Sequence, residues 1–225
     1  MTDGLSLEGV RIALRGVPLV SLDVRIAPGE VLTIMGPSGS GKSTLLSLLV
    51  GACPPEFETR GRVLLGGRDL AGLGPRERRI GLLFQDDLLF PHMSVGANLA
   101  FALPPSLRGR AARRRAVEAA LEDAELAGFA DRDPATLSGG QRSRVALMRT
   151  LLGEPQALLL DEPFSRLDAD LRESLRGFVF DRIRARGVPA LLVTHDAEDA
   201  AAAGGRVVDP LGRGAGAQAK AASLS

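Results

Sequence analysis

The feature that most constrains this sequence is a glycine-rich stretch at residues 36–44. It reads Gly36, Pro37, Ser38, Gly39, Ser40, Gly41, Lys42, Ser43, Thr44, and it fits the pattern G-x-x-x-x-G-K-[ST] of a phosphate-binding loop. The apolar run at residues 31–35 before it is typical of a buried strand. Leucines at helical spacing follow it, and Gly51 predicts the helix end. The stretch therefore has the strand, loop and helix context that the motif requires.

The residue types of this loop suit the phosphates of a nucleotide. Glycines allow a tight turn in which successive N–H groups point at phosphate oxygens, and the helix N-terminus adds partial positive charge. Lys42 can reach the β- and γ-phosphates, and the Ser43 hydroxyl can bind Mg²⁺. Among 28 basic residues only Lys42 and Lys220 are lysines, so an arginine-rich chain has a lysine where the motif needs one. We therefore predict a nucleotide-phosphate site rather than a glycine-rich turn without a ligand.

Composition sets broader bounds. A chain of 225 residues that is 45% hydrophobic suits one α/β domain with room for a subdomain. Its net charge of +1 gives no general argument for nucleic-acid binding. Cys53 is the single cysteine, which predicts no disulfide within the chain and a reducing compartment. No segment offers the roughly 20 apolar residues needed to span a bilayer, and the N-terminus does not resemble a secretion signal. We expect any membrane role to depend on partner proteins.

Hydrophobic patterning predicts mostly strands outside one central region. Strands are expected at residues 5–12, 19–26, 31–35, 62–65, 80–84, 157–160 and 190–194. Residues 53–61 are expected to form a loop, and helices are expected from residue 139 to 152 and from 168 to 186.

Residues 86–136 differ in character, because residues 116–124 carry a helical apolar stripe flanked by arginines and acids. This pattern predicts a small helical insertion whose arginines form a solvated face. Phe90, Met93 and Phe101 are expected to be core or contact residues. Beyond residue 205 the chain is rich in glycine and alanine, which predicts a flexible tail over residues 206–225.

The second half of the chain adds further motifs. Residues 137–141 read Leu-Ser-Gly-Gly-Gln and open a helix, which is a second place for backbone N–H groups to meet an anion. Twenty residues later an apolar strand ends in Asp161 and Glu162, and the strand at 190–194 ends at His195. With the phosphate loop and Gln85, these motifs occur in the order seen in the ATP-binding subunits of ABC transporters. The chain resembles that family from about residue 5 to 205.

The resemblance implies an α/β fold of the P-loop NTPase type, with a mainly parallel sheet core and an N-terminal antiparallel β subdomain. It implies an ATPase domain over residues 1–205, with a helical subdomain at about residues 86–150 inserted between the phosphate loop and the Asp161–Glu162 part. It also implies ATP and Mg²⁺ as cofactors.

Roles for single residues follow from the same resemblance. Asp161 would bind Mg²⁺, usually through water, together with Ser43 and Gln85. Glu162 would be the general base that polarises the attacking water. His195 would contact the γ-phosphate, and Gln85 would sense Mg²⁺ and the attacking water. The alternatives are two acids in a surface turn, a structural histidine and an ordinary strand-end glutamine.

In the family the Leu-Ser-Gly-Gly-Gln signature acts across two copies. The two copies would be arranged head to tail, and the signature of one copy would close over ATP held by the phosphate loop of the other. The signature residues concerned are Ser138, Gly139, Gly140 and Gln141. The implied partners are this second copy, transmembrane permease subunits and, indirectly, a substrate-binding protein, with no nucleic acid. The implied location is cytoplasmic, peripheral on the inner face of the cell membrane. His92 lies in a stretch that resembles importer ATPases, and we interpret it as a partner contact or as neutral.

Two departures from the family pattern stand out. Most members have an aromatic residue before the phosphate loop that stacks on adenine, but this chain has no Trp or Tyr and its first Phe is Phe57. Leu14 and Arg15 are expected at that position. Arg166 stands where small residues are commoner, close to the expected dimer interface.

The leading hypothesis is the energy-coupling ATPase of an importer whose membrane subunits are separate chains. One alternative is a non-transport ATPase of the same superfamily acting on DNA or ribosomes. DNA-repair members carry long coiled coils where this chain has only residues 45–136, and ribosome-acting members usually carry two cassettes. A small-molecule kinase would leave the signature unexplained. Three segments, around residues 84–90, 133–142 and 163–168, resemble ATPases assigned to thiamine uptake, which implies thiamine or a related small solute.

Overall fold

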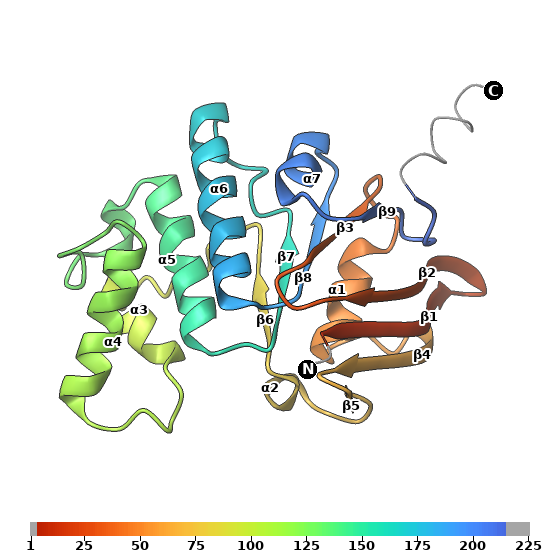
Figure 1. Ribbon diagram of the computed structural model, residues 1–225, viewed down its shortest axis with the longest axis horizontal. Helices are drawn as coiled ribbons and strands as arrows, with labels where there is room; N and C mark the ends of the chain where they lie inside the picture. The colour runs from red at the N-terminus through yellow and green to blue at the C-terminus, as the bar shows by residue number, and fades with distance from the viewer. Residues whose placement is uncertain (1–3, 215–225) are drawn as a thin grey trace. The chain divides into compact units, whose positions relative to one another are not determined.

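The computed structural model (Figure 1) describes residues 4–214. These residues divide into two compact units. Within these residues, unit 1 comprises residues 4–82, 156–162 and 180–214, and unit 2 comprises Leu83–Pro155 and Pro163–Val179. Strands and helices alternate along most of the chain, so the predicted α/β class is confirmed.

Unit 1 contains a four-stranded antiparallel sheet in the order β2-β1-β4-β5. Its strands are β1 (Leu5–Leu14), β2 (Val17–Ile26), β4 (Phe57–Leu65) and β5 (Arg68–Asp69). β1 and β2 are joined by the two-residue turn Arg15–Gly16, in which both residues have positive φ, 51° and 78°. Such a turn matches the twist of a hairpin. Apolar side chains on one face of β1 are buried, which explains the alternation read from the sequence.

The second sheet has five strands in the order β6-β7-β8-β3-β9. They are β3 (Val31–Met35), β6 (Ile80–Leu83), β7 (Ala157–Asp161), β8 (Ala190–Thr194) and β9 (Val207–Val208). The pairs β7–β8, β8–β3 and β3–β9 are parallel. Because both faces of a parallel sheet are covered, its strands are continuously apolar rather than alternating, and β8 is buried along its whole length.

Helix α1 (Lys42–Val50) joins the two sheets of unit 1 in one hydrophobic core. Its Leu45, Leu46 and Leu49 are buried with strand residues from both sheets. Gly51 ends the helix in the left-handed conformation, and its N–H bonds to carbonyls of the last turn, as predicted. The short helices α2 (Pro75–Arg78) and α7 (Ala197–Ala203) also lie in unit 1.

Unit 2 is mainly helical. It contains α3 (Val95–Ala102), α4 (Arg110–Asp123), α5 (Gly139–Leu152), a 3₁₀ turn (Pro134–Thr136) and the start of α6 (Ala169–Arg186), which ends in unit 1. The buried Asn98 of α3 anchors the loop before it, because its side chain accepts a bond from Phe90 N–H and donates to the carbonyls of Phe90, Met93 and Ser94. Helices therefore predominate in unit 2, which covers residues 83–155 and 163–179.

Two local expectations were wrong. β4 begins at Phe57, within the expected loop, because residues 57–60 pair with β1 through the backbone while most of their side chains remain exposed. Residues 206–214 were expected in the flexible tail, but β9 pairs with β3, and Pro210 O accepts a bond of 2.8 Å from Ser21 N–H. The rest of that tail, from residue 215, lies outside the described residues. Within residues 4–214 we find no helix with the length and apolar character that a bilayer crossing requires.

Candidate functional site

Three neighbouring strand ends of unit 1 carry the residues singled out in the sequence. β8 lies between β3 and β7, with Met35 opposite Thr194 and Asp161 opposite Val193. The phosphate loop follows β3, His195 follows β8, and Glu162 follows β7. Ligands of open α/β sheets bind outside the carboxyl ends of the strands, so this edge is the candidate site.

The phosphate loop folds around the Lys42 ammonium. Lys42 is buried, and its Nζ donates hydrogen bonds of 2.7 Å to Gly36 O and 2.8 Å to Pro37 O. Gly41 has φ 89°, and a Cβ there would lie 2.9 Å from the Leu19 Cβ, so only glycine fits. The ammonium thus stands at the N-terminus of α1, where the helix also favours an anion. Loop, lysine and helix N-terminus together have the geometry and charge that suit a phosphate group.

The two acids after β7 are held differently. Asp161 is half-buried, and burial together with the neighbouring Glu162 raises the pKa of its carboxyl, an effect that Lys42 partly offsets. Glu162 has φ 46°, in the left-handed region where a residue other than glycine is strained. Its N–H donates to Val193 O at 2.9 Å, and its Oε2 lies 3.2 Å from His195 Nδ1. The predicted base and the predicted γ-phosphate contact are therefore adjacent.

A supporting group at the end of β8 escaped the sequence analysis. Thr194 Oγ1 donates to Asp199 Oδ2 at 2.9 Å and accepts from Asp196 N–H at 3.1 Å, and both Thr194 and Asp199 are buried. These bonds fix the turn that carries His195. An acid five residues after a strand gives no distinctive signal in a single sequence.

The oxygen donors of unit 1 fit Mg²⁺. This ion takes one or two protein oxygens and completes its shell with phosphates and water. Ser43, exposed at the start of α1, offers a hydroxyl, and Asp161 offers a carboxylate whose pKa is raised by burial and by the neighbouring Glu162. The described residues contain no cluster of three or more His, Cys, Asp or Glu side chains that could hold a metal by itself. These oxygen donors suit an ion whose shell is completed by phosphate oxygens and water.

The signature residues lie in unit 2, at the start of α5. Ser138 is the N-cap, where its Oγ accepts a bond of 3.3 Å from Gln141 N–H and its own N–H donates to Gln141 Oε1 at 3.0 Å. A Cβ on Gly140 would lie 2.3 Å from Leu171 Cδ1, so this glycine permits close packing by α6, whereas Gly139 has space. Ser138 and Gln141 thus build the helix start whether or not they also bind a ligand.

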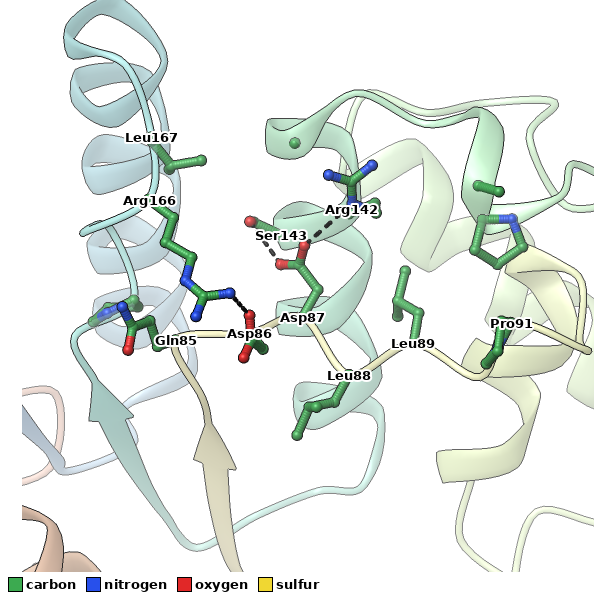
Figure 2. Close-up of a pocket in the computed structure, with 14 residues that line it drawn as sticks. Gln85, Asp86, Asp87, Leu88, Leu89, Pro91, Arg142, Ser143, Arg166 and Leu167 are labelled. Atoms are coloured by element: carbon green, nitrogen blue, oxygen red, sulfur yellow. Dashed lines mark hydrogen bonds and ion pairs between the residues drawn. The ribbon is translucent and has the colours of Figure 1, made fainter.

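Gln85 also lies in unit 2, two residues after the end of β6, and it is exposed. It lines a cavity of about 390 Å³ together with Gly139, Arg142 and Arg166 (Figure 2). Unit 1 therefore brings together the phosphate loop, Asp161, Glu162 and His195, and unit 2 contains Gln85 and residues 138–141.

The expected base-contact residues stand in the β1–β2 hairpin of unit 1. Leu14 is the last residue of β1 and pairs with Val17, and Arg15 is exposed in the turn. Neither can provide an aromatic face.

Comparison with known proteins identifies the family of the chain. Residues 19–165 match the family described as ABC transporter. The chain belongs to this family of ATP-binding proteins. Its members are ATPases, so the chain is an ATPase, and the predicted P-loop NTPase fold is confirmed.

Three proteins with different names show the range of sequences to which the chain is similar. An uncharacterized ABC transporter ATP-binding protein, YnjD of Escherichia coli, is 51% identical over 181 residues, which cover 80% of this chain and 83% of YnjD. The spermidine/putrescine import ATP-binding protein PotA of Frankia alni is 47% identical over 83% of this chain and 40% of its own length. The thiamine import ATP-binding protein ThiQ of Cereibacter sphaeroides is 45% identical over 79% of this chain and 76% of ThiQ. The chain thus spans less than half of PotA but most of YnjD and ThiQ.

Proposed function

We propose that this ATPase powers solute import through separate membrane subunits. The observation that carries the proposal is the joint placement of the phosphate loop, Asp161, Glu162 and His195 at one sheet edge, in a chain similar to proteins named for import. The alternative of a non-transport ATPase acting on DNA or ribosomes is not favoured by these relatives.

In this proposal each residue has a chemical role. The phosphate loop and Lys42 hold the ATP phosphates, and Ser43, Asp161 and Gln85 hold or sense Mg²⁺. Glu162 takes a proton from the attacking water, and His195 binds the γ-phosphate. The left-handed backbone at Glu162 stores about 1–3 kcal/mol of strain, which is typical of a functional position.

We also propose that two copies assemble head to tail, so that residues 138–141 of one copy cover ATP held by the other. This requires the start of α5 to remain accessible in unit 2, and Ser138, Gly139 and Gln141 are not buried there. Binding of ATP would bring the copies together, and hydrolysis would release them.

Unit 2 offers a surface suited to a membrane subunit. Leu88 and Phe101 are 54% and 67% exposed, and the Phe101 ring lies 5.0 Å from that of Phe90. Large apolar side chains grouped on a surface mark protein contacts. We place the chain at the inner face of the cell membrane, bound to such a partner, with His92 beside Phe90 in the same region. Thiamine or a related small solute is the proposed cargo, by similarity to ThiQ.

Reconstitution tests this proposal. The chain is purified with its membrane subunits in detergent and placed in vesicles that contain ATP, and uptake of radiolabelled thiamine is compared with uptake of putrescine and ferric iron. Uptake that requires ATP and is lost in Lys42→Ala supports import, and the favoured solute identifies the cargo. Co-purification with ribosomes or DNA, and hydrolysis stimulated by them rather than by membrane subunits, would contradict it.

A further inference from the structure

Arg166 connects two segments of unit 2 that are far apart in the sequence. Its guanidinium forms an ion pair with the carboxylate of Asp86, 80 positions earlier. Figure 2 shows the Arg166 side chain reaching Asp86 beside Gln85. Both charged side chains keep contact with solvent, with 60% and 54% of their surface exposed. The residue that departs from the family pattern thus contacts the residue next to Gln85.

The two residues after Asp86, at positions 87 and 88, are held by side chains of α5 rather than by Arg166. Ser143 of α5 donates a bond of 2.7 Å to Asp87 Oδ1, and Arg142 Nε lies 3.5 Å from Asp87 Oδ2. Arg149, also of α5, donates to the backbone carbonyls of Asp87 at 3.0 Å and Leu88 at 2.7 Å. Leu88 itself has a left-handed backbone, with φ 46°. The segment after Gln85 is therefore fixed at residues 87–88 by α5, and at Asp86 by Arg166.

We propose that Arg166 is a positioning residue for Gln85. By holding Asp86 it restricts the backbone next to Gln85, and it links this backbone to residues 163–168, which directly follow Asp161 and Glu162 in the chain. The inference rests on the proposed function, in which Gln85 meets Mg²⁺ and the attacking water. A single exposed ion pair contributes little to stability, so its loss should alter Gln85 rather than unfold the protein.

The first experiment detects the link without hydrolysis. The chain has no Trp or Tyr, so Phe84→Trp, at a position that is 45% exposed, gives a single tryptophan beside Gln85. In this background Arg166→Ala and Asp86→Ala should each raise the rate of acrylamide quenching by about twofold, a modest change suited to loss of one exposed pair. The double variant should equal either single one. The control is Arg62→Ala, which removes the similarly exposed Arg62–Glu8 pair of 2.6 Å in unit 1 and should change nothing.

The second experiment measures the consequence for hydrolysis. Arg166→Ala should raise the Mg²⁺ concentration that gives half the maximal ATPase rate by about two- to fivefold, the range expected for one exposed pair. ATP affinity without Mg²⁺ and the melting temperature should stay unchanged. Arg166→Lys should keep part of the effect, and the charge reversal Arg166→Asp with Asp86→Arg should recover most of it.

The two experiments separate the possible failures. Quenching that does not change in the single variants, or that adds up in the double variant, overturns the inference. A lower ATPase rate with the parent's Mg²⁺ dependence, or no recovery on charge reversal, also overturns it by showing a purely structural role. If the parent does not hydrolyse ATP, the proposed function fails, and the quenching experiment still decides whether Arg166 holds the segment at Gln85.

Discussion

Replacing Glu162 by glutamine tests the centre of the proposed mechanism. The carboxylate lies 3.2 Å from His195 Nδ1, and the backbone N–H bonds to Val193 O at 2.9 Å. Glutamine keeps the volume of the side chain and leaves the backbone bond intact, but it cannot take a proton from water. We expect hydrolysis to fall by about 10²–10⁴-fold, the usual share of a general base. This corresponds to about 3–5 kcal/mol on the activation barrier.

Binding of ATP should survive the same change. Lys42 is held by its bonds to Gly36 O and Pro37 O in the loop after β3, and Glu162→Gln changes neither bond. Removal of one negative charge near the phosphates also lowers the repulsion of the bound anion. Glu162→Gln should therefore accumulate as an ATP-bound dimer, visible by size-exclusion chromatography with ATP, while phosphate release measures the rate.

A matched control is available at Glu154. This glutamate also has a left-handed backbone, with φ 50°, but it belongs to unit 2, whereas the strand ends of β3, β7 and β8 belong to unit 1. Glu154→Gln should keep the parent rate. The reasoning is refuted if Glu162→Gln stays monomeric and hydrolyses ATP at the parent rate, or if the control loses as much activity.

Three further predictions follow from the same geometry. Ser138→Arg should abolish hydrolysis but keep nucleotide binding. Mixing this variant with Lys42→Ala should restore at most one composite site per heterodimer. Equal loss of ATP binding in the two variants would contradict the role of residues 138–141 at the ATP site of the other copy. Asp161→Asn should raise the melting temperature at pH 7 without nucleotide, because the raised pKa of Asp161 means that the folded state disfavours its carboxylate. The difference in melting temperature between variant and parent should develop above pH 3.8 and vanish below it. A difference that stays constant with pH would exclude this cause. Leu14→Tyr should tighten ATP binding by supplying an aromatic face, and the parent should discriminate poorly between ATP and GTP; strong ATP preference in the parent, unaffected by changes at Leu14 and Arg15, would show that another group contacts the base.

Much of the fold could be predicted because its signals are local. A buried strand, a glycine loop and a helix ending at Gly51 follow one another directly along the chain, so their pattern is readable from neighbouring residues. β4 shows the limit. Residues 57–60 have few buried side chains, and they become a strand because β1, more than forty residues earlier, offers its backbone. Long-range pairing of a polar edge leaves no periodicity to read.

The candidate site shows the same division. The phosphate loop could be predicted from the chemistry of its residue types, and Asp161 and Glu162 could be predicted from the family resemblance. The Arg166–Asp86 pair and the Thr194–Asp199 bond could not, because each joins common residue types at spacings that no motif fixes. The left-handed backbone of Glu162 was equally hidden, since positive φ is usually signalled by glycine.

The register of β7 and β8 gives a physical reason for the left-handed backbone of Glu162. Asp161 is the last residue of β7 and stands opposite Val193, and Glu162 N–H adds one more bond, to Val193 O. This bond holds the Glu162 nitrogen in line with the strand, while the chain must leave the sheet at the next residue. The change of direction therefore falls on Glu162 itself, at φ 46°, and its side chain is directed to His195 after β8. A glycine would relieve the strain but would remove the carboxylate, so at this position the chain retains strain for the sake of a reactive group.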